Sequence, residues 1–432
     1  MKDLHPLRLP VSPHVTRIAL ALALLLAGGA AAAAGPDAPD SAPASADSTT
    51  ARAGKGAKHH DGWNLDARVL GYGGGFDGYG VRRVSGGLLG AEAALVPELR
   101  AGEWKLAVPL ELAHRQTLGA SLSETSGHVA VEPTYRISRA LDLCAEAGLS
   151  GAWRPDWPDL YQRDATGYMP GTERYSYLSW RVGASLHARP FDRQHLRLHY
   201  RYVSTTYERD PAFDPGAPMH LTPRDNGQHR IDLSWRVLGE GYARGDGYAA
   251  GVRFGYDHRQ DFTLLARDAG TGFSSGNPLQ RLDRAEPAVD VELKRLEGRL
   301  EARLEYGYQI QNDPFQAYYS YQGHHPTLVI AYAFDEALSA RARLEGWFHT
   351  YGPDSKANTA DGKRLHDDKA LVKGELRYAL RDGLSLVAEG EWIWRDTNYP
   401  DYVPGVYPAT RFYDIRWSYD NLRTIAGVEW RR

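Results

Sequence analysis

Charged side chains recur at every second position in several segments of this sequence, and that spacing governs the chemistry open to them. In the segment 194–202, Arg197, His199 and Arg201 alternate with apolar residues. Alternation with period two is typical of a β-strand, in which successive side chains point to opposite faces. A row of cations on one strand face acts on its surroundings mainly through its electric field, provided that the face meets water.

The same alternation places further charged side chains on one face of their strands. Burying so many ionised groups in a dry core would be very unfavourable, because each would lose its hydration. We therefore expect these side chains to line a water-filled space. The basic members are Arg181, Arg197, His199, Arg201, Arg230, Arg236 and Arg253, and the acidic members are Asp290, Glu292, Glu389 and Glu391.

Signatures of catalysis and of metal binding are weak. His195 and His199 share a strand face, but four residues of strand span ~13 Å, which is too far for one metal ion. No nucleophile elbow is present, and the single cysteine, Cys144, excludes a disulfide framework and a cysteine zinc cage. We expect no catalytic residues, metal or cofactor. A net charge of -3 gives no reason to expect a nucleic-acid partner.

The elements that must position these side chains are long strands with two unlike faces. About sixteen candidate strands of about 10–14 residues follow residue 62, whereas strands of soluble proteins have about five or six residues. A tilted strand needs about 9–11 residues to cross a bilayer. The candidate strands are 63–72, 86–96, 103–115, 127–137, 140–154, 175–188, 194–207, 228–238, 247–257, 286–296, 298–311, 326–334, 337–351, 369–380, 383–396 and 415–431.

The connections between these strands alternate between short and long. Outer-membrane barrels have short periplasmic turns and long external loops, and an even strand number returns both chain ends to one side. We allow 14–18 strands. Short turns are expected at 138–139, 189–192, 296–298, 335–336 and 381–383, and long loops near 154–174, 207–227, 258–280, 312–325, 352–368 and 396–411.

The first 34 residues have the three parts of a secretory signal peptide. Lys2, Arg8 and Arg17 precede the apolar run 18–26, and small residues follow it. The apolar run is too short for a permanent membrane helix, which needs ~20 residues. Residues 35–61 contain almost no large apolar side chains and predict a disordered leader. We therefore expect a cleavable signal peptide over 1–34, and a chain that works beyond the inner membrane.

The last strand carries the sharpest resemblance to a known class. Its outward positions alternate toward a near-terminal aromatic residue, with Leu422, Thr424, Ala426, Val428 and Trp430 in one phase. This pattern resembles the C-terminal assembly signal of bacterial outer-membrane β-barrels of the porin-like class, and the likeness in pattern covers residues 62–432. In that class the aromatic is commonly the last residue, whereas here two arginines follow it.

The resemblance implies an all-β fold, a transmembrane antiparallel up-and-down β-barrel over residues 62–432, located in the cell outer membrane. It also implies outer-membrane lipid, the barrel-assembly machinery and periplasmic chaperones as partners, with Val428 and Trp430 as the assembly signal. No specific family is identified by this pattern.

In a sixteen-strand ring the seventh and eighth strands face the fifteenth and sixteenth. Arg197 and Arg201 would then look across the lumen at Glu389 and Glu391. Opposed walls of unlike charge would order water and favour hydrophilic solutes. The alternative is that neighbouring strands exchange salt bridges that stabilise the wall.

Aromatic residues gather in the segment expected outside the membrane between two late strands: Phe315, Tyr318, Tyr319 and Tyr321. Tyrosine faces stack on sugar rings, which would suit a saccharide route. The alternative is that these side chains pack the loop against the barrel rim.

Together these features predict a polar, water-filled channel for hydrophilic solutes, and no enzyme. Two alternatives stay open. One is a barrel component of surface polysaccharide export or of envelope-spanning machinery, which would need periplasmic export partners. The other is a structural barrel or an outer-membrane lipid-modifying enzyme. A channel conducts ions by itself in a bilayer, whereas a long loop at 154–174 or 258–280 would close a plugged barrel.

Overall fold

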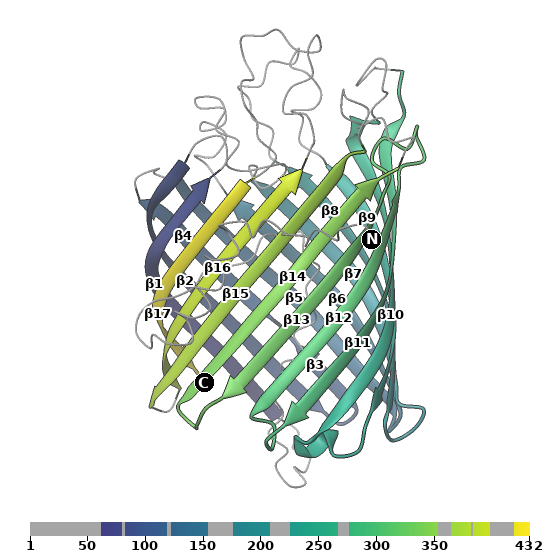
Figure 1. Cartoon of the computed structure of the whole chain (residues 1–432). Coiled ribbons are helices and arrows are strands. Elements are labelled where there is room, and N and C mark those ends of the chain that lie inside the picture. Colours follow the sequence, from purple (N-terminus) through teal and green to yellow (C-terminus); the bar gives the residue numbers. More distant parts are fainter. Residues whose placement is uncertain are drawn as a thin grey trace, which may run out of the picture.

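A computed structural model describes residues 62–79, 83–118, 122–153, 176–207, 225–266, 276–352, 364–381, 383–397 and 419–432. These residues form one barrel of tilted strands (Figure 1). The expected signal peptide and leader, residues 1–61, lie outside the described residues, as does the expected loop 154–174.

The strands follow one another in chain order around the barrel. They are β1 (Gly62–Tyr79), β2 (Arg83–Ala101), β3 (Trp104–Ala107), β4 (Leu110–Leu118), β5 (Leu122–Ser138), β6 (Leu141–Trp153), β7 (Tyr177–Ala188), β8 (Gln194–Tyr207), β9 (Asn226–Leu238), β10 (Gly247–Leu265), β11 (Leu279–Arg295), β12 (Leu300–Asn312), β13 (Tyr321–Ala333), β14 (Leu338–Tyr351), β15 (His366–Arg381), β16 (Leu384–Thr397) and β17 (Tyr419–Arg431).

Every strand pairs antiparallel with its neighbours, and β1 pairs with both β2 and β17, so the sheet is closed. The short strands β3 and β4 both lie between β2 and β5 and form one interrupted strand. The interruption falls at Val108 and Pro109, because proline has no backbone N–H for the ladder. The result is a closed antiparallel barrel of 16 strands, as the sequence predicts.

Most predicted strands are confirmed within a few residues, and 194–207 is confirmed at both ends. Two predicted loops are partly wrong. β10 runs on to Leu265 and β11 starts at Leu279, inside the expected loop 258–280. β13 starts at Tyr321 rather than at 326. Both extensions carry polar residues on both faces, so the apolar alternation ends before the hydrogen-bonded strand does.

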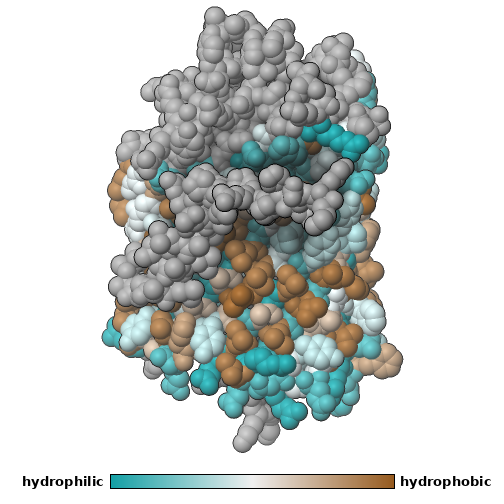
Figure 2. All heavy atoms as spheres, in the orientation of Figure 1, coloured by the Kyte–Doolittle hydropathy of each residue, from teal (hydrophilic) through white to brown (hydrophobic). Residues whose placement is uncertain are grey.

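The outer face of the barrel is apolar. Leu178 is 60% exposed, Leu112 58% and Val289 54%, and each belongs to the apolar phase of its strand. Figure 2 shows apolar residues gathered over the middle of the outer surface, with hydrophilic residues toward its lower edge. An outward apolar band on a closed sheet is the arrangement that a lipid bilayer requires. The chain therefore has the fold of an outer-membrane β-barrel.

The connections at the predicted short turns 138–139, 189–192, 296–298 and 335–336 lie at one end of the barrel, the lower end in Figure 1, where the C-terminus also lies. We call this the short-turn end. The connection between β9 and β10 contains one 3-10 turn, Tyr242–Arg244. Among the described residues, no helix has the length and hydropathy needed to span a membrane.

The barrel closes where β1 meets β17, and a buried apolar cluster lies on the lumen side of this seam, next to the ion pair of Arg68 with Glu429. The two strands pair from Arg68 opposite Arg431 to Tyr79 opposite Asp420. Tyr72 has a glycine as register partner on each side, Gly427 on β17 and Gly90 on β2. A Cβ atom at Gly90 would lie 2.3 Å from Cζ of Tyr72. The Tyr72 ring occupies the space that a side chain at position 90 would need. It belongs to a buried apolar cluster with Leu70, Leu88, Val387 and Ile425.

Replacing Gly90 by valine is expected to destabilise the barrel, because the new side chain collides with the Tyr72 ring. Overpacking of this kind costs about 1–3 kcal/mol. The urea midpoint of the refolded barrel in lipid vesicles measures the loss.

The matched control is Gly71→Val, since a Cβ at Gly71 meets nothing within 4 Å. Adding Tyr72→Ala to Gly90→Val should recover part of the lost stability. An equal loss in the Gly71 and Gly90 variants would contradict the close packing at the seam.

Candidate functional site: the polar lumen wall

The predicted charged side chains all lie in the inward phase of their strands. Arg181, Arg197, His199, Arg201, Arg230, Arg236, Arg253, Asp290, Glu292, Glu389 and Glu391 alternate with the exposed apolar residues of the outer face. Ion pairs that pass over an intervening strand confirm this placement. Glu146 on β6, for example, reaches Arg201 on β8 across β7.

Glu146 is the centre of the ion pairs on β6, β7 and β8. Its carboxylate forms a two-pronged pair with Arg201, lies 3.8 Å from Nε of Arg181, and lies 3.5 Å from Nε2 of His199. Arg181 also lies 3.0 Å from Nε2 of His128 on β5. Three of the predicted basic residues therefore share one acid on their own side of the barrel.

The acids of β11 hold the next group of arginines. Arg236 pairs with Glu292 and lies 3.5 Å from Asp290. Tyr242, in the turn at the short-turn end, donates its hydroxyl to the same Glu292. Burial, and after it this hydrogen bond, raises the pKa of the Tyr242 phenol. This hydrogen bond thus attaches the connection between β9 and β10 to β11 on the lumen wall.

Arg230 and Arg253 join the same wall through neighbouring strands. Arg230 lies 3.1 Å from Asp232 and 3.5 Å from Asp257. Arg253 lies 3.1 Å from Glu286 and 2.7 Å from Glu305.

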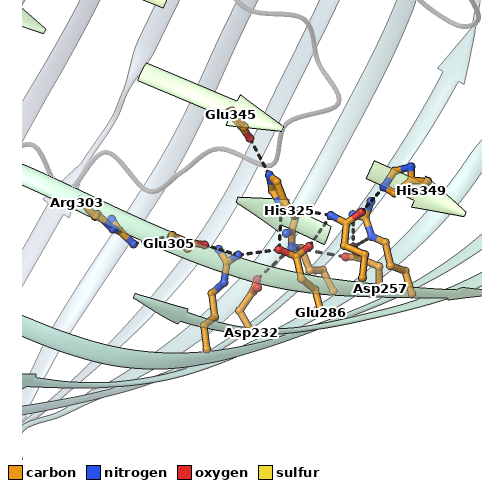
Figure 3. A network of polar contacts seen from close by, with 12 residues as sticks. Asp232, Asp257, Glu286, Arg303, Glu305, His325, Glu345 and His349 are labelled. Carbon is orange, nitrogen blue, oxygen red and sulfur yellow. Dashed lines mark hydrogen bonds and ion pairs between the residues drawn. The ribbon is translucent and has the colours of Figure 1, made fainter. Parts of the chain in front are cut away.

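A hydrogen-bonded chain centred on His325 continues across β11 to β14. Nδ1 of His325 lies 3.1 Å from Glu286 and Nε2 lies 2.9 Å from Glu345. Figure 3 shows the His325 ring between these two carboxylates. With both ring nitrogens facing carboxylates, the arrangement is satisfied by a doubly protonated imidazolium. The ring also stacks on Trp347, with centroids 5.2 Å apart.

The hydrogen-bonded chain extends from Glu286 toward the end of the barrel opposite the short-turn end. Gln309 donates to Glu286 at 2.8 Å and accepts from Nε2 of His349 at 2.9 Å. His349 in turn stacks on Tyr321, with centroids 4.1 Å apart. Four strands are thereby joined by side chains on the lumen side.

The acids predicted to face the basic wall have partners beside them. Glu389 lies 2.8 Å from Lys373, and Glu391 lies 2.9 Å from Arg423. Glu429 joins Arg377 to Arg68, the latter at 2.7 Å. This arrangement favours the exchange of salt bridges between neighbouring strands over two opposed walls of unlike charge.

Arg197 differs from the other predicted cations. It has no hydrogen bond or ion pair with any residue in the described part of the chain. Its Nε is buried without a hydrogen-bond partner, as are the Nε atoms of Arg181, Arg236 and Arg253, but those three guanidinium groups pair with acids through other contacts. Its register partners are His187 on β7 and Ser234 on β9.

The predicted loop aromatics divide into two groups. Tyr318 and Tyr319 pack with Leu365 and Tyr351 at the rim, which favours packing over sugar stacking. Phe315 lies in the same loop, half-buried. The prediction for Tyr321 is wrong, because this residue begins β13 and is buried on the lumen side.

Asp313 organises this loop. Its carboxylate accepts from the backbone N–H groups of Phe315 and Tyr319. Burial raises the pKa of the Asp313 carboxyl, while the two N–H bonds act in the opposite direction. The same residue donates its own N–H to Ser320, so the loop from β12 to β13 is closed on itself.

The predicted assembly-signal residues lie on the outer face. Val428 is 48% exposed and Trp430 41%. Trp430 is opposite Val69 on β1 and Leu384 on β16, next to the closing seam. Their role in assembly stays a prediction.

Sequence reasoning missed the centre of the His325 chain. His325 and Tyr321 fell in a predicted loop, although both share the inward phase of residues 327–333. Extending that phase upstream by three positions would have found them. Gln309 and Tyr242 carry no formal charge, so the pattern of charged residues does not predict them. Among the described residues, no group of His, Cys, Asp or Glu side chains is arranged to hold a metal ion.

Comparison with known proteins identifies no family. No family model matches this chain, and no curated protein matches it.

Similar solved structures are outer-membrane proteins. Outer-membrane expressed OmpT of Vibrio cholerae is 11% identical, with 86% of this chain and 97% of that chain covered and a TM-score of 0.41. OprB of Pseudomonas putida is 11% identical, with 86% and 94% covered and a TM-score of 0.45. A bacterial polysaccharide outer membrane secretin is 10% identical, with 85% and 98% covered and a TM-score of 0.40. The fold assignment follows from the closed strand pairing of the chain itself.

Replacing His325 by alanine is expected to destabilise the barrel, because Glu286 and Glu345 both lose their shared partner. The loss should be about 1–3 kcal/mol, the usual cost of leaving a partly buried hydrogen-bonding group unsatisfied. Urea unfolding in lipid vesicles, followed by tryptophan fluorescence, measures it.

His324→Ala is the matched control, because the neighbouring ring points outward and contacts Tyr306 and Tyr308. It loses two exposed ring contacts and an exposed hydrogen bond with the Tyr306 hydroxyl, so its cost should be smaller than that of His325→Ala, in which two buried carboxylates lose their partner. A larger loss for His324→Ala than for His325→Ala would show that the lumen chain contributes no stability.

Proposed function

We propose that this barrel is an open, water-filled channel that passes hydrophilic solutes across the outer membrane. The observation that carries the proposal is the polar lumen wall. Its predicted charged side chains are buried or half-buried and, apart from Arg197, paired, whereas the opposite face of the same strands is apolar. Charged groups lining a barrel interior stay hydrated only where water fills that interior.

The direction of the ion pairs supports an open lumen. The ion pairs of the lumen wall named above join neighbours or next neighbours around the ring, as in Glu146–Arg201, Glu286–His325 and Arg377–Glu429. Barrels of 16–18 strands are wide enough to leave an aqueous channel when their side chains stay at the wall.

The proposal includes export by the N-terminal signal peptide and residence in the outer membrane. The apolar outer band and the basic-apolar-small order of residues 1–34 support these two points. It assigns no catalytic residue to the barrel, and passage follows the solute gradient.

The experiment is conductance across a planar bilayer, using the detergent-refolded chain from Gly35 onward. Stable current steps with a defined ion selectivity are expected, because a lumen lined with hydrated charges conducts small ions. Heat-modifiable migration in gels shows beforehand that the sample is folded.

A folded sample that inserts but gives no current would overturn the channel. It would point instead to a plugged export component, a structural barrel or a lipid-modifying enzyme. A sample that stays soluble in plain buffer and never enters bilayers would overturn membrane residence itself.

A further inference from the structure

Arg197 lies in a row of hydrogen-bonding side chains that crosses the lumen wall near the short-turn end. His187 on β7 and Ser234 on β9 are its register partners, so all three lie on the inward face of adjacent strands. His195 precedes Arg197 by two residues on the same face of β8. Arg197 is the fourth residue of β8 and is half-buried.

The acids nearest to this row are engaged with other cations. Asp232 lies 3.1 Å from Arg230 and 3.9 Å from His199. Asp142, the register partner of His187, lies 3.1 Å from Arg189.

Glu292 on β11 is also occupied, because it pairs with Arg236 on β9. The guanidinium of Arg197 therefore has no acid partner among the described residues, and its Nε is buried without an acceptor.

We propose that Arg197, with His187, His195 and Ser234, forms an oxyanion-binding site on the lumen wall, and that the barrel favours solutes bearing a phosphate or carboxylate group. The inference rests on the proposed channel function, since it names the class of solute that this wall selects.

The chemistry of the row fits such a ligand. A guanidinium presents parallel N–H groups that match two oxygens of a phosphate or carboxylate. The hydroxyl of Ser234 adds a donor on one side of it. On the other side, Nε2 of His187 lies 3.0 Å from Oγ of Ser185, so the donor that His187 offers a ligand is its Nδ1–H. In a wall where acids hold the other predicted cations, an oxyanion supplies the negative partner that the Arg197 guanidinium lacks among the described residues.

Arg341 provides a matched control on the other side of the barrel. It is the fourth residue of β14, as Arg197 is of β8, and it has the same inward phase. Its register partners are Ala331 and Glu375, and the Glu375 carboxylate lies 3.1 Å from Arg377. Ser339 precedes Arg341 by two residues on the same face, so the row around Arg341 has a serine but no histidine. Replacing either arginine by glutamine removes one lumen charge at the same depth.

The test measures block of chloride current by inorganic phosphate in a planar bilayer, with acetate as a second probe. Phosphate is expected to block the native channel saturably. Arg197→Gln should raise the half-blocking concentration about tenfold, the effect of losing one or two charged hydrogen bonds. Arg341→Gln should leave it within about twofold, and Ser234→Ala should raise it in the same direction as Arg197→Gln.

The two probes separate the sources of the oxyanion. Block by phosphate alone that depends on Arg197 identifies phosphorylated solutes, and block by both anions that depends on Arg197 identifies carboxylates as well. No block, or an equal shift in the Arg197 and Arg341 variants, overturns the site while the channel stands.

A folded barrel that inserts but carries no current overturns the proposed channel and leaves the oxyanion site to be tested by binding. In that case equilibrium dialysis of the detergent-refolded protein against radiolabelled phosphate decides. Binding by the native chain and by Arg341→Gln that is lost in Arg197→Gln supports the site, and equal retention in all three overturns it. Heat-modifiable migration confirms that each variant is folded.

Discussion

The closed backbone ladder is the constraint on which the rest of this structure depends. Hydrocarbon offers no partner to an N–H or C=O group, so each spanning strand must bond to a strand on both sides. The pairing of β1 with β17 meets that requirement at the only place where the chain order does not supply a neighbour. Once the ring is closed, a slip of one residue would turn a whole strand's apolar face into the lumen. Closure therefore fixes which side chains meet lipid and which meet water.

The distance between charged groups determines which inward charges compensate one another. In the proposed water-filled lumen, charges on opposite walls interact through a high dielectric, and ions screen them beyond about 8 Å at physiological ionic strength. A carboxylate on the next strand is about 3 Å away, as for Glu391 and Arg423, in a wall that excludes part of the water. Local pairing is consequently stronger than attraction between opposed walls, and the lumen wall becomes a band of linked strands.

The sequence predicts well which side chains face the lumen and which face outward. It predicts poorly which inward side chains form ion pairs with one another. Apolar alternation located sixteen strands and placed Arg201, Glu292 and Glu391 on the inward side, because phase within a strand is a local property. Pairing depends on the register between strands. Nothing local links Glu286 to His325, which are 39 residues apart, or Arg377 to Glu429, which are 52 apart. The pattern also fades near the membrane surface, where both faces become polar, and for that reason Tyr321 and His325 were placed in a loop.

Pairing also changes what a lumen charge means for function. Arg201 and Arg197 are equivalent in the sequence, since both are arginines in one phase of one strand. The structure separates them, because Glu146 neutralises the first while the described residues leave the second without an acid. A neutralised guanidinium contributes rigidity to the wall and little field to the lumen. An uncompensated one keeps its charge and its donors available to whatever passes. If the barrel is the channel proposed above, its selectivity therefore depends on the few unpaired charges rather than on the total number of charged residues.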